Sequence, residues 1–273
     1  MKRNKSVLLS VPYILWMLVF TLIPLGVVGY YALTDPDTGA FTWSNMAQLV
    51  TYLPVFGRSI GYSIISAFLC LLLGYPVAYY IAHRGPLAQK LLYMLVMLPM
   101  CMSFLLRTLA WVGLLQDTGI INSFLESMGL ARVSLIRTPG AVILGMVYNY
   151  LPYMVLPIYT VMEKMDNRLI EAASDLGCNG FQVLTKVIFP LSASGIVSGI
   201  TMVFVPSVST FYISQKLGGG KYQLIGDAIE RQFQKAYDYN LGSALSFVLM
   251  ILIFISMAVM NAFDSDENGG MVV

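Results

Sequence analysis

The sequence is short of charged residues. Only 11% of its 273 residues are Asp, Glu, Lys or Arg, whereas 58% are hydrophobic. Soluble domains carry about 25% charged residues, so a water-exposed globule of this length is excluded. The net charge of +2 gives no reason to expect a nucleic-acid partner. The composition, with a mean hydropathy of +0.74, indicates an integral membrane protein surrounded by lipid.

Residues that hold metals or form disulfides are also scarce. His83 is the only histidine, which excludes an HExxH zinc site and a haem held by two histidines. Cys70, Cys101 and Cys178 form no CxxC pair, and two of them stand in apolar runs. This spacing argues against a disulfide framework and a zinc cluster. We therefore expect neither a metal site nor catalytic residues in this chain.

Long apolar runs are abundant. Six of them contain twenty or more residues, enough to cross about 30 Å of hydrocarbon as helices. They cover residues 8–33, 59–82, 91–115, 139–162, 190–213 and 243–263. We predict an all-α polytopic membrane protein with six transmembrane helices. They form a single transmembrane domain, residues 1–273, with both termini on one side of the membrane.

The orientation depends on Lys and Arg near the span ends. If the N-terminus is cytoplasmic, eight of these residues lie inside and seven outside, and the outer ones are more dispersed. The basic start, Met1-Lys2-Arg3-Asn4-Lys5, also favours this orientation. We therefore expect cytoplasmic termini. No small-residue cleavage site follows the first apolar run, so we interpret it as an uncleaved span.

Charge is almost absent from the predicted spans, where Arg107 is the only charged residue. Ion-driven transporters need intramembrane carboxylates or histidines to carry protons or sodium. Energy for uphill transport would therefore have to come from elsewhere. Two interpretations of Arg107 stay open: an anchor near an interface or paired with backbone carbonyls, and a residue of a solute pathway.

The predicted loop 163–189 has the pattern of two short helices joined by a turn. Its cap and turn residues are Asp166 or Asn167 at the first start, Gly177 at the first end, and Asn179 with Gln182 at the second start. Polar N-caps, a left-handed glycine and a capping box are the usual local signals for such ends. The loop is therefore predicted to be a compact helical knob.

Two further features of this loop concern its use. Pro190 is expected to open the fifth span at a helix N-terminus, where a missing N–H costs little. Ala172 and Ala173 stand beside the carboxylate of Glu171. Small side chains allow another protein to approach the backbone closely. A carboxylate gives such a contact a charge and fixes its alignment. These residues indicate a docking element.

The spacing in this loop resembles the signature cytoplasmic loop of bacterial ABC-importer permeases. The matching residues are Glu171, Ala172, Ala173, Gly177, Val187, Phe189 and Pro190, although that family usually has Ile and Leu where Val187 and Phe189 stand. The resemblance implies a coupling helix, between the fourth and fifth spans, that sits in a cleft of a cytoplasmic ATP-binding subunit dimer. It also implies a second homologous permease, an extracytoplasmic substrate-binding protein, and a place in the bacterial cell membrane.

The chain itself has no nucleotide site. A P-loop needs Gly-x-x-x-x-Gly-Lys-Ser/Thr. The nearest segment, Gly218–Tyr222, has Gln215 where the first glycine belongs and Tyr222 where the hydroxyl residue belongs. We therefore expect a transport subunit that is not an enzyme and holds no cofactor, with ATP and Mg²⁺ bound by the partner ATPase.

Further segments are similar to permeases of spermidine/putrescine importers, and most to the first of their two permease subunits. These segments are Gly74–Tyr79, Gly145–Pro157, Pro206–Gly219, Leu224–Gly226 and Gln232–Phe233. The resemblance implies polyamine import, with iron(III), opine or phosphonate import as the alternative. The acidic residue that the family often has near Gln215 is missing.

A polycation passes through a membrane most readily along aromatic faces, hydroxyls and carbonyls. The candidate pathway residues are Tyr148, Tyr150, Tyr153, Ser207, Thr210, Phe211 and Tyr212. The alternative for each is ordinary packing within a span. Loops 34–58, 116–138 and 214–242 are placed to receive the binding protein.

Two other classes remain as distant alternatives. An intramembrane enzyme would need a serine and a histidine facing each other in the membrane, and His83 lies in a loop. A passive channel would not need a loop that docks an ATPase.

Overall fold

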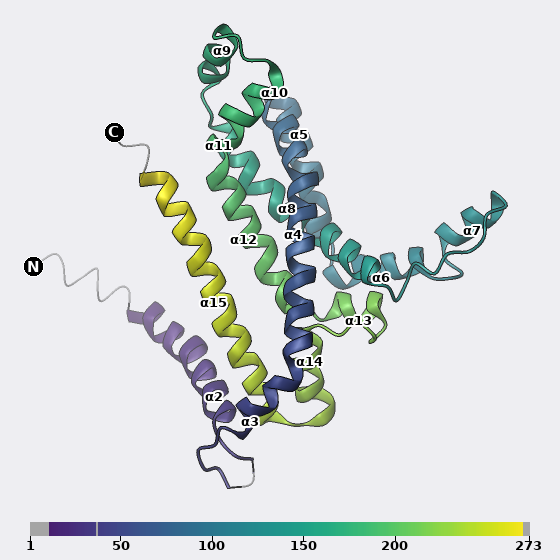
Figure 1. The fold of residues 1–273 in the computed structure, drawn as a ribbon, viewed down its shortest axis with the longest axis vertical. Coiled ribbons are helices and arrows are strands. Elements are labelled where there is room, and N and C mark those ends of the chain that lie inside the picture. Colours follow the sequence, from purple (N-terminus) through teal and green to yellow (C-terminus); the bar gives the residue numbers. More distant parts are fainter. Residues whose placement is uncertain (1–10, 37, 270–273) are drawn as a thin grey trace, which may run out of the picture. The chain divides into compact units, whose positions relative to one another are not determined.

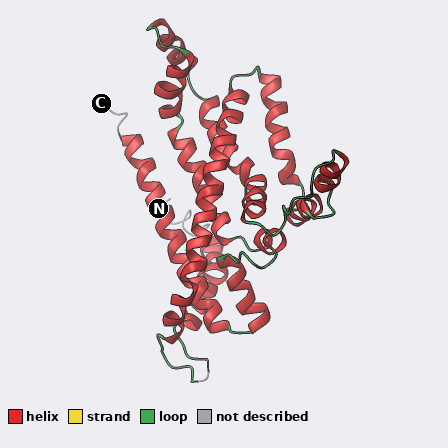
Figure 2. Cartoon of the chain, turned by 45° about the vertical axis from the view of Figure 1, so that its right-hand side comes forward, coloured by secondary structure: helices red, strands yellow, loops and turns green. Residues whose placement is uncertain are grey.

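The structure is a computed structural model that describes residues 11–36 and 38–269. These residues form helices, and the one β pairing among them is a single bridge between Thr34 and Phe41. The prediction of an all-α protein is confirmed (Figure 2). The basic segment 1–5 and residues 8–10 of the predicted first span lie outside the described residues.

The chain divides into two compact units. Unit 1 comprises Met1–Pro54 and Ala228–Leu252, and unit 2 comprises Val55–Asp227 and Ile253–Val273. The helices α14 (Ile225–Arg231) and α15 (Tyr239–Gly269) contribute residues to both units, and the first two residues of α4 (Leu53–Ala82) belong to unit 1.

Unit 1 begins with a continuous apolar helix, Val11–Ala32, which contains η1 (Leu18–Leu22) and α2 (Ile23–Ala32). Its other helices are α3 (Ser44–Gln48), η2 (Leu49–Tyr52), η5 (Gln232–Ala236) and the first part of α15. The buried amide of Asn240 donates to the carbonyls of Tyr31 (3.1 Å) and Thr34 (2.6 Å). It therefore satisfies carbonyls at a helix end that have no partner within the helix.

Unit 2 contains most of the helices (Figure 1). They are α4 (Leu53–Ala82), α5 (Pro86–Met97), η3 (Leu98–Cys101), α6 (Phe104–Leu115), α7 (Ile120–Ser127), α8 (Pro139–Glu163), α9 (Asn167–Asp175), α10 (Gly180–Val183), η4 (Leu184–Ile188), α11 (Phe189–Leu191), α12 (Ala193–Ser209) and α13 (Tyr212–Gly218). Among the long apolar helices of the described chain, α8 is the most buried.

Glycines allow α12 to pack closely on α8. A Cβ at Gly195 would lie 3.0 Å from the carbonyl oxygen of Pro157 and 3.1 Å from the Cα of Ile158. A Cβ at Gly199, four residues on, would lie 2.7 Å from the Sδ of Met154. In a membrane such small-xxx-small pairs drive helix association, because lipid offers no hydrophobic force between helices. We call this contact the α8–α12 seam.

Five helices are long and apolar enough to cross a membrane, and six if the bent pair Gly180–Leu191 and Ala193–Ser209 counts as one span, within residues 11–36 and 38–269. The predicted span 91–115 is not one helix. After the 3₁₀ turn that contains Pro99, the backbone is extended at Met102 (ψ 149°) and Ser103 (ψ 129°), and α6 begins afresh. Proline removes a backbone donor and favours such a break.

The predicted span 190–213 also differs from the structure. Its helix, α12, covers only Ala193–Ser209, because the chain bends by 66° before it and is extended at Thr210 after it. Pro190 therefore stands near the end of the preceding helix, two residues before the bend at Ser192, and does not open the span as predicted.

Candidate functional site

The knob predicted for loop 163–189 is present, at the end of unit 2 where α8 meets α9 (Figure 1). Asp166 is the N-cap of α9, and its Oδ1 accepts the N–H of Arg168 at 3.0 Å. Gly177 ends α9 in a left-handed conformation, φ +85°. The N–H of Cys178 donates to the Ala173 carbonyl at 3.1 Å, and that of Gly177 to the Ser174 carbonyl at 2.9 Å. This pair of bonds is a Schellman motif.

The second helix of the knob also begins as predicted. Asn179 and Gln182 form a reciprocal capping box, with bonds of 3.0 and 2.9 Å. The helix then widens into a π turn, η4, where the N–H of Phe189 donates to the carbonyl of Leu184. Pro190 follows directly and has no N–H to continue the α-helical bonding. The 66° bend comes at Ser192.

The exposed side chains of the knob are those that another protein can reach. Glu171 and Ala172 are exposed, and so are Leu176 (87%) and Phe181 (74%). Ala173 is buried together with Val183 and Ile188. The small size of Ala173 therefore serves packing inside the knob, whereas only Ala172 offers a close approach from outside. This corrects the expectation that both alanines face a partner.

Among the candidate pathway residues, Tyr150 lies beside the end of α12. Its hydroxyl donates to the Pro206 carbonyl at 3.3 Å, and Ser209 Oγ donates to the same oxygen at 3.4 Å. Because Thr210 is extended, its N–H points to the Ser207 carbonyl (3.4 Å) and leaves the Pro206 carbonyl without a helical donor. Two hydroxyls thus supply the hydrogen bonds that the Pro206 carbonyl lacks at the broken end of this membrane helix.

The other candidates occupy three different surroundings. Ser207 is fully buried and its hydroxyl bonds its own helix at Val203. The Tyr153 ring lies 6.4 Å from that of Tyr150. Tyr148 and Tyr212 instead contact α6, at Trp111 and Phe104 respectively, while Phe211 is exposed. The structure brings Tyr150 and Thr210 together at the broken end of α12, with Tyr153 beside Tyr150.

Sequence reasoning did not foresee how close α6 and residue 226 come to these candidates. Phe104 and Trp111 carry the aromatic contacts of α6. Gly226 lies against the break itself, since a Cβ there would be 2.5 Å from the Ser209 carbonyl oxygen and 2.6 Å from that of Thr210. In the sequence, this close contact between Gly226 and the end of α12 is indicated only by a glycine that follows two apolar residues.

Arg107 is buried on the first turn of α6, with 7% of its surface exposed. Its Nε and Nη1 have no hydrogen-bond partner in the described part of the chain. It lies within electrostatic reach of Tyr150. The carbonyl pairing considered for an anchor is therefore absent at these two nitrogens, and a buried cation stands beside the candidate pathway.

Comparison with known proteins identifies the family of this chain. Residues 72–266, more than half of its length, match the family model described as "Binding-protein-dependent transport system inner membrane component". The chain belongs to this family. As a multi-pass inner-membrane component of a transport system, it is a permease subunit and not an enzyme.

Among its relatives are spermidine/putrescine transport system permease proteins named PotB. The protein from Haemophilus influenzae is 38% identical over 247 residues, covering 87% of this chain and 86% of the relative. The protein from Escherichia coli K12 is 35% identical over 253 residues, covering 89% and 92%.

Solved structures of ABC transporters share the fold. A chain of a bacterial transporter involved in import of the acidic polysaccharide alginate has a TM-score of 0.78 and 18% identity, covering 97% of this chain and 96% of that one. A chain of the MetNI methionine transporter in an inward-facing conformation has a TM-score of 0.59 and 16% identity, covering 81% and 98%.

Proposed function

We propose that this permease is the first of two permease subunits in an ATP-driven importer of spermidine and putrescine. The observation that carries the proposal is the identity of 35–38% to polyamine permeases, spread over nearly nine-tenths of the chain. In this proposal the two permeases together enclose the pathway, and an extracytoplasmic binding protein delivers the solute. Both termini are cytoplasmic.

The knob is the element through which the ATPase acts in this proposal. Glu171, Ala172 and the exposed apolar residues of the loop dock in a cleft of the ATP-binding subunit dimer. Gly177 and Ala173 hold the knob in shape, and Pro190 precedes the bend that joins it to α12. ATP and Mg²⁺ bind to the partner and not to this chain. The capped, internally bonded knob with an exposed carboxylate supports this assignment.

The pathway in this proposal runs beside the broken end of α12, with Tyr148, Tyr150, Tyr153, Ser207, Thr210, Phe211 and Tyr212 as its candidate lining. Aromatic faces and hydroxyls attract ammonium groups without trapping them. The buried Arg107, within electrostatic reach of Tyr150, favours the alternative of an anionic or complexed substrate, such as iron(III), an opine or a phosphonate.

The test is uptake of labelled spermidine, putrescine and ferric iron by the native host with the gene intact, deleted, or carrying Glu171→Arg. The matched control is Asp175→Arg, the same charge reversal at another exposed position of α9. We expect polyamine uptake to be lost on deletion and with Glu171→Arg, at an unchanged amount of protein in the membrane, and to persist with Asp175→Arg.

Other outcomes separate the parts of the proposal. Normal polyamine uptake with reduced iron uptake would overturn the substrate and leave the ATP-driven permease standing. Equal losses with both charge reversals would overturn the special role of Glu171. Unchanged uptake of every solute in the Glu171→Arg strain would overturn coupling through the knob.

A further inference from the structure

The segment 116–133, which we call the α7 arm, projects from unit 2. It follows α6 directly, and both α6 and α7 run across the direction of α4, α8 and α12 (Figures 1 and 2). The arm consists of α7 and an extended return segment. Phe104–Ser127, which contains α6 and α7, is one of the five described helices long and apolar enough to cross a membrane, but in this orientation it lies along the membrane surface.

The connection between α6 and α7, at the base of the arm, is held by close backbone contact. A Cβ at Gly119 would lie 2.6 Å from the carbonyl oxygens of both Gly113 and Leu114 and 2.8 Å from that of Gln116. No side chain fits at this position without moving backbone. Gly119 therefore lets the start of α7 pack directly on the end of α6.

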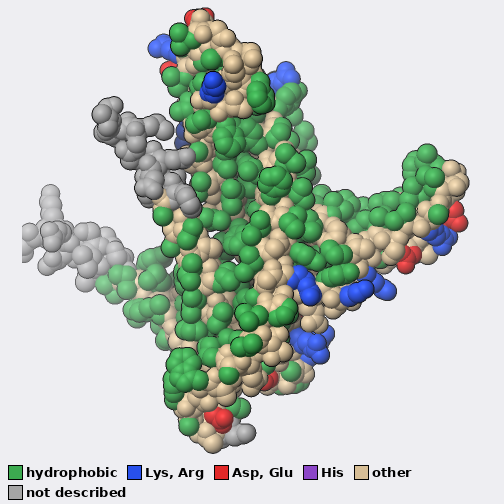
Figure 3. All heavy atoms as spheres, viewed as in Figure 1, with side chains coloured by type: hydrophobic (Ala, Val, Ile, Leu, Met, Phe, Trp, Pro, Cys, Tyr) green, Lys and Arg blue, Asp and Glu red, His purple; other side chains and the backbone are tan. Residues whose placement is uncertain are grey.

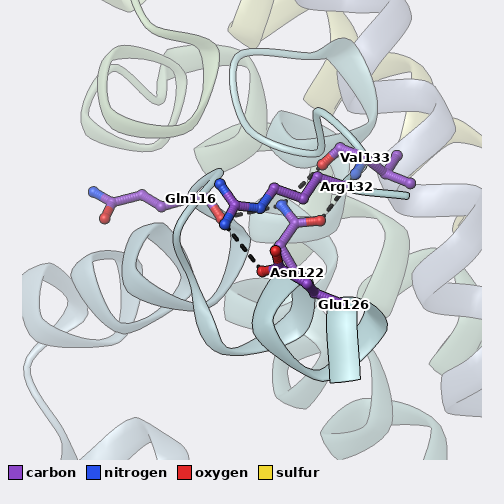
Figure 4. A network of polar contacts seen from close by, with 5 residues as sticks. All are labelled: Gln116, Asn122, Glu126, Arg132 and Val133. Atoms are coloured by element: carbon purple, nitrogen blue, oxygen red, sulfur yellow. Dashed lines mark hydrogen bonds and ion pairs between the residues drawn. The ribbon is translucent and has the colours of Figure 1, made fainter. Parts of the chain in front are cut away.

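The return segment is bonded to α7 through one buried amide (Figure 4). Asn122, 1% exposed, accepts the N–H of Val133 at 2.9 Å and donates to the carbonyls of Val133 at 3.0 Å and Gln116 at 3.3 Å. The two halves of the arm are thus bonded to each other within the chain.

The two sides of the arm differ in chemistry. Ile120, Phe124 and Met128 recur every four residues and are 69%, 64% and 62% exposed, so they form one apolar stripe. Glu126 and Arg132 form an exposed ion pair with a distance of 2.9 Å. In Figure 3 hydrophobic side chains run along the edge of the arm that faces the α9 end of unit 2, and the charged ones lie on the opposite edge.

We propose that the α7 arm is an interfacial membrane anchor, with the stripe of Ile120, Phe124 and Met128 inserted among lipid acyl chains and the Glu126–Arg132 pair facing water. The apolar edge continues into unit 2, where Leu105, Leu106 and Leu109 of α6 are also exposed. Lipid fits this surface because apolar and charged side chains lie on opposite edges of a helix perpendicular to the spans. The proposal uses the membrane location of the family and does not depend on the substrate.

Spin-label accessibility tests the proposal in the assembled transporter, reconstituted in vesicles of phosphatidylethanolamine and phosphatidylglycerol. A background without reactive cysteines carries Cys70→Ala, Cys101→Ser and Cys178→Ala. Single labels are placed at Phe124→Cys and, as a second position on the stripe, Met128→Cys. The control is Ser123→Cys, exposed and about 100° away around α7. Collisions with oxygen report lipid, and collisions with a water-soluble nickel complex report water.

We expect the ratio of oxygen to nickel collisions at both stripe positions to exceed that at position 123 by about threefold or more, as for a side chain in the acyl region. A high nickel collision rate at Phe124→Cys and Met128→Cys would place the stripe in water and overturn the proposal. Protection of both positions from both reagents would identify a protein partner, such as the second permease, and would also overturn it. Uptake is not part of the readout, so a wrong substrate assignment cannot imitate either result.

Discussion

The knob, residues 163–189, and the α8–α12 seam are built in opposite ways. The knob is held by bonds between residues only a few positions apart, and its outer side chains are exposed. The seam joins residues some forty positions apart, and its glycines lie against backbone atoms of the facing helix. The knob can therefore change its surface without losing its shape, whereas the seam tolerates almost no added volume.

The largest effect is expected at the seam. Gly195→Leu adds a side chain where a Cβ already meets the Pro157 carbonyl and the Ile158 Cα, both backbone atoms that cannot turn aside. We expect a loss of about 3 kcal/mol or more in stability, because overpacking forces the helices apart. The measurement is the midpoint of thermal unfolding of the purified protein in detergent.

Gly61→Leu is the control for this change, because Gly61 has no atom within 4 Å of a built Cβ. Its midpoint should stay close to that of the parent protein. Similar losses at both positions would contradict the importance of the seam.

A smaller and more selective effect is expected within the knob. Ala173→Leu should cost about 1–3 kcal/mol by overpacking the buried side of α9, whereas Ala172→Leu should leave stability unchanged because its side chain is exposed. Ala172→Leu should instead weaken co-purification with the ATP-binding subunit. Thermal unfolding and co-purification, measured on both variants, check the two effects.

If both leucine variants unfold at the same temperature, the division of the two alanines into an inner and an outer one is wrong. If Ala172→Leu retains full co-purification, the outer alanine is not part of the docking surface.

A small effect of the opposite sign is expected from Arg107→Met. Two of the guanidinium nitrogens have no partner within the described residues, so the substitution removes few bonds together with a buried charge. Replacing a buried charge by an apolar side chain of similar length is often neutral or stabilising, and we expect a change between 0 and about 2 kcal/mol in favour of Met. The unfolding midpoint measures it, and a clear fall would show that Arg107 is an anchor after all.

The sequence predicted best what local chemistry determines. Asp166, Gly177 and the Asn179–Gln182 pair each act on neighbours within a few residues, so their caps were predicted correctly. The apolar runs likewise predicted the all-α membrane fold, because hydrocarbon leaves few other ways to bond a backbone.

Breaks and long-range contacts were harder to predict. The hydropathy of residues 91–115 predicts a single span. Met102 and Ser103 interrupt the helix there, but they do not interrupt the run of apolar residues, so the break is not visible in the hydropathy. Ala173 is buried in the same hydrophobic core as Val183 and Ile188, which follow it in the chain beyond the turn at Gly177, so its neighbours in sequence do not reveal its burial. Gly195 and Gly199 did carry a sequence signal, the small-xxx-small spacing, which identifies a packing face without naming the helix that fills it.

The 66° bend at Ser192 determines the direction in which a movement of the knob would reach α12. A straight helix transmits a displacement along its own axis, whereas a bent pair of helices changes the direction of that displacement. When the helix Gly180–Leu191 is displaced along its length, less than half of that displacement runs along α12 and most of it is directed across α12. Since Gly195 holds α12 against α8 one turn beyond the bend, the seam becomes a fulcrum. If a partner ATPase presses on the knob as proposed, the far end of α12, where Tyr150 bonds Pro206, would move sideways the most.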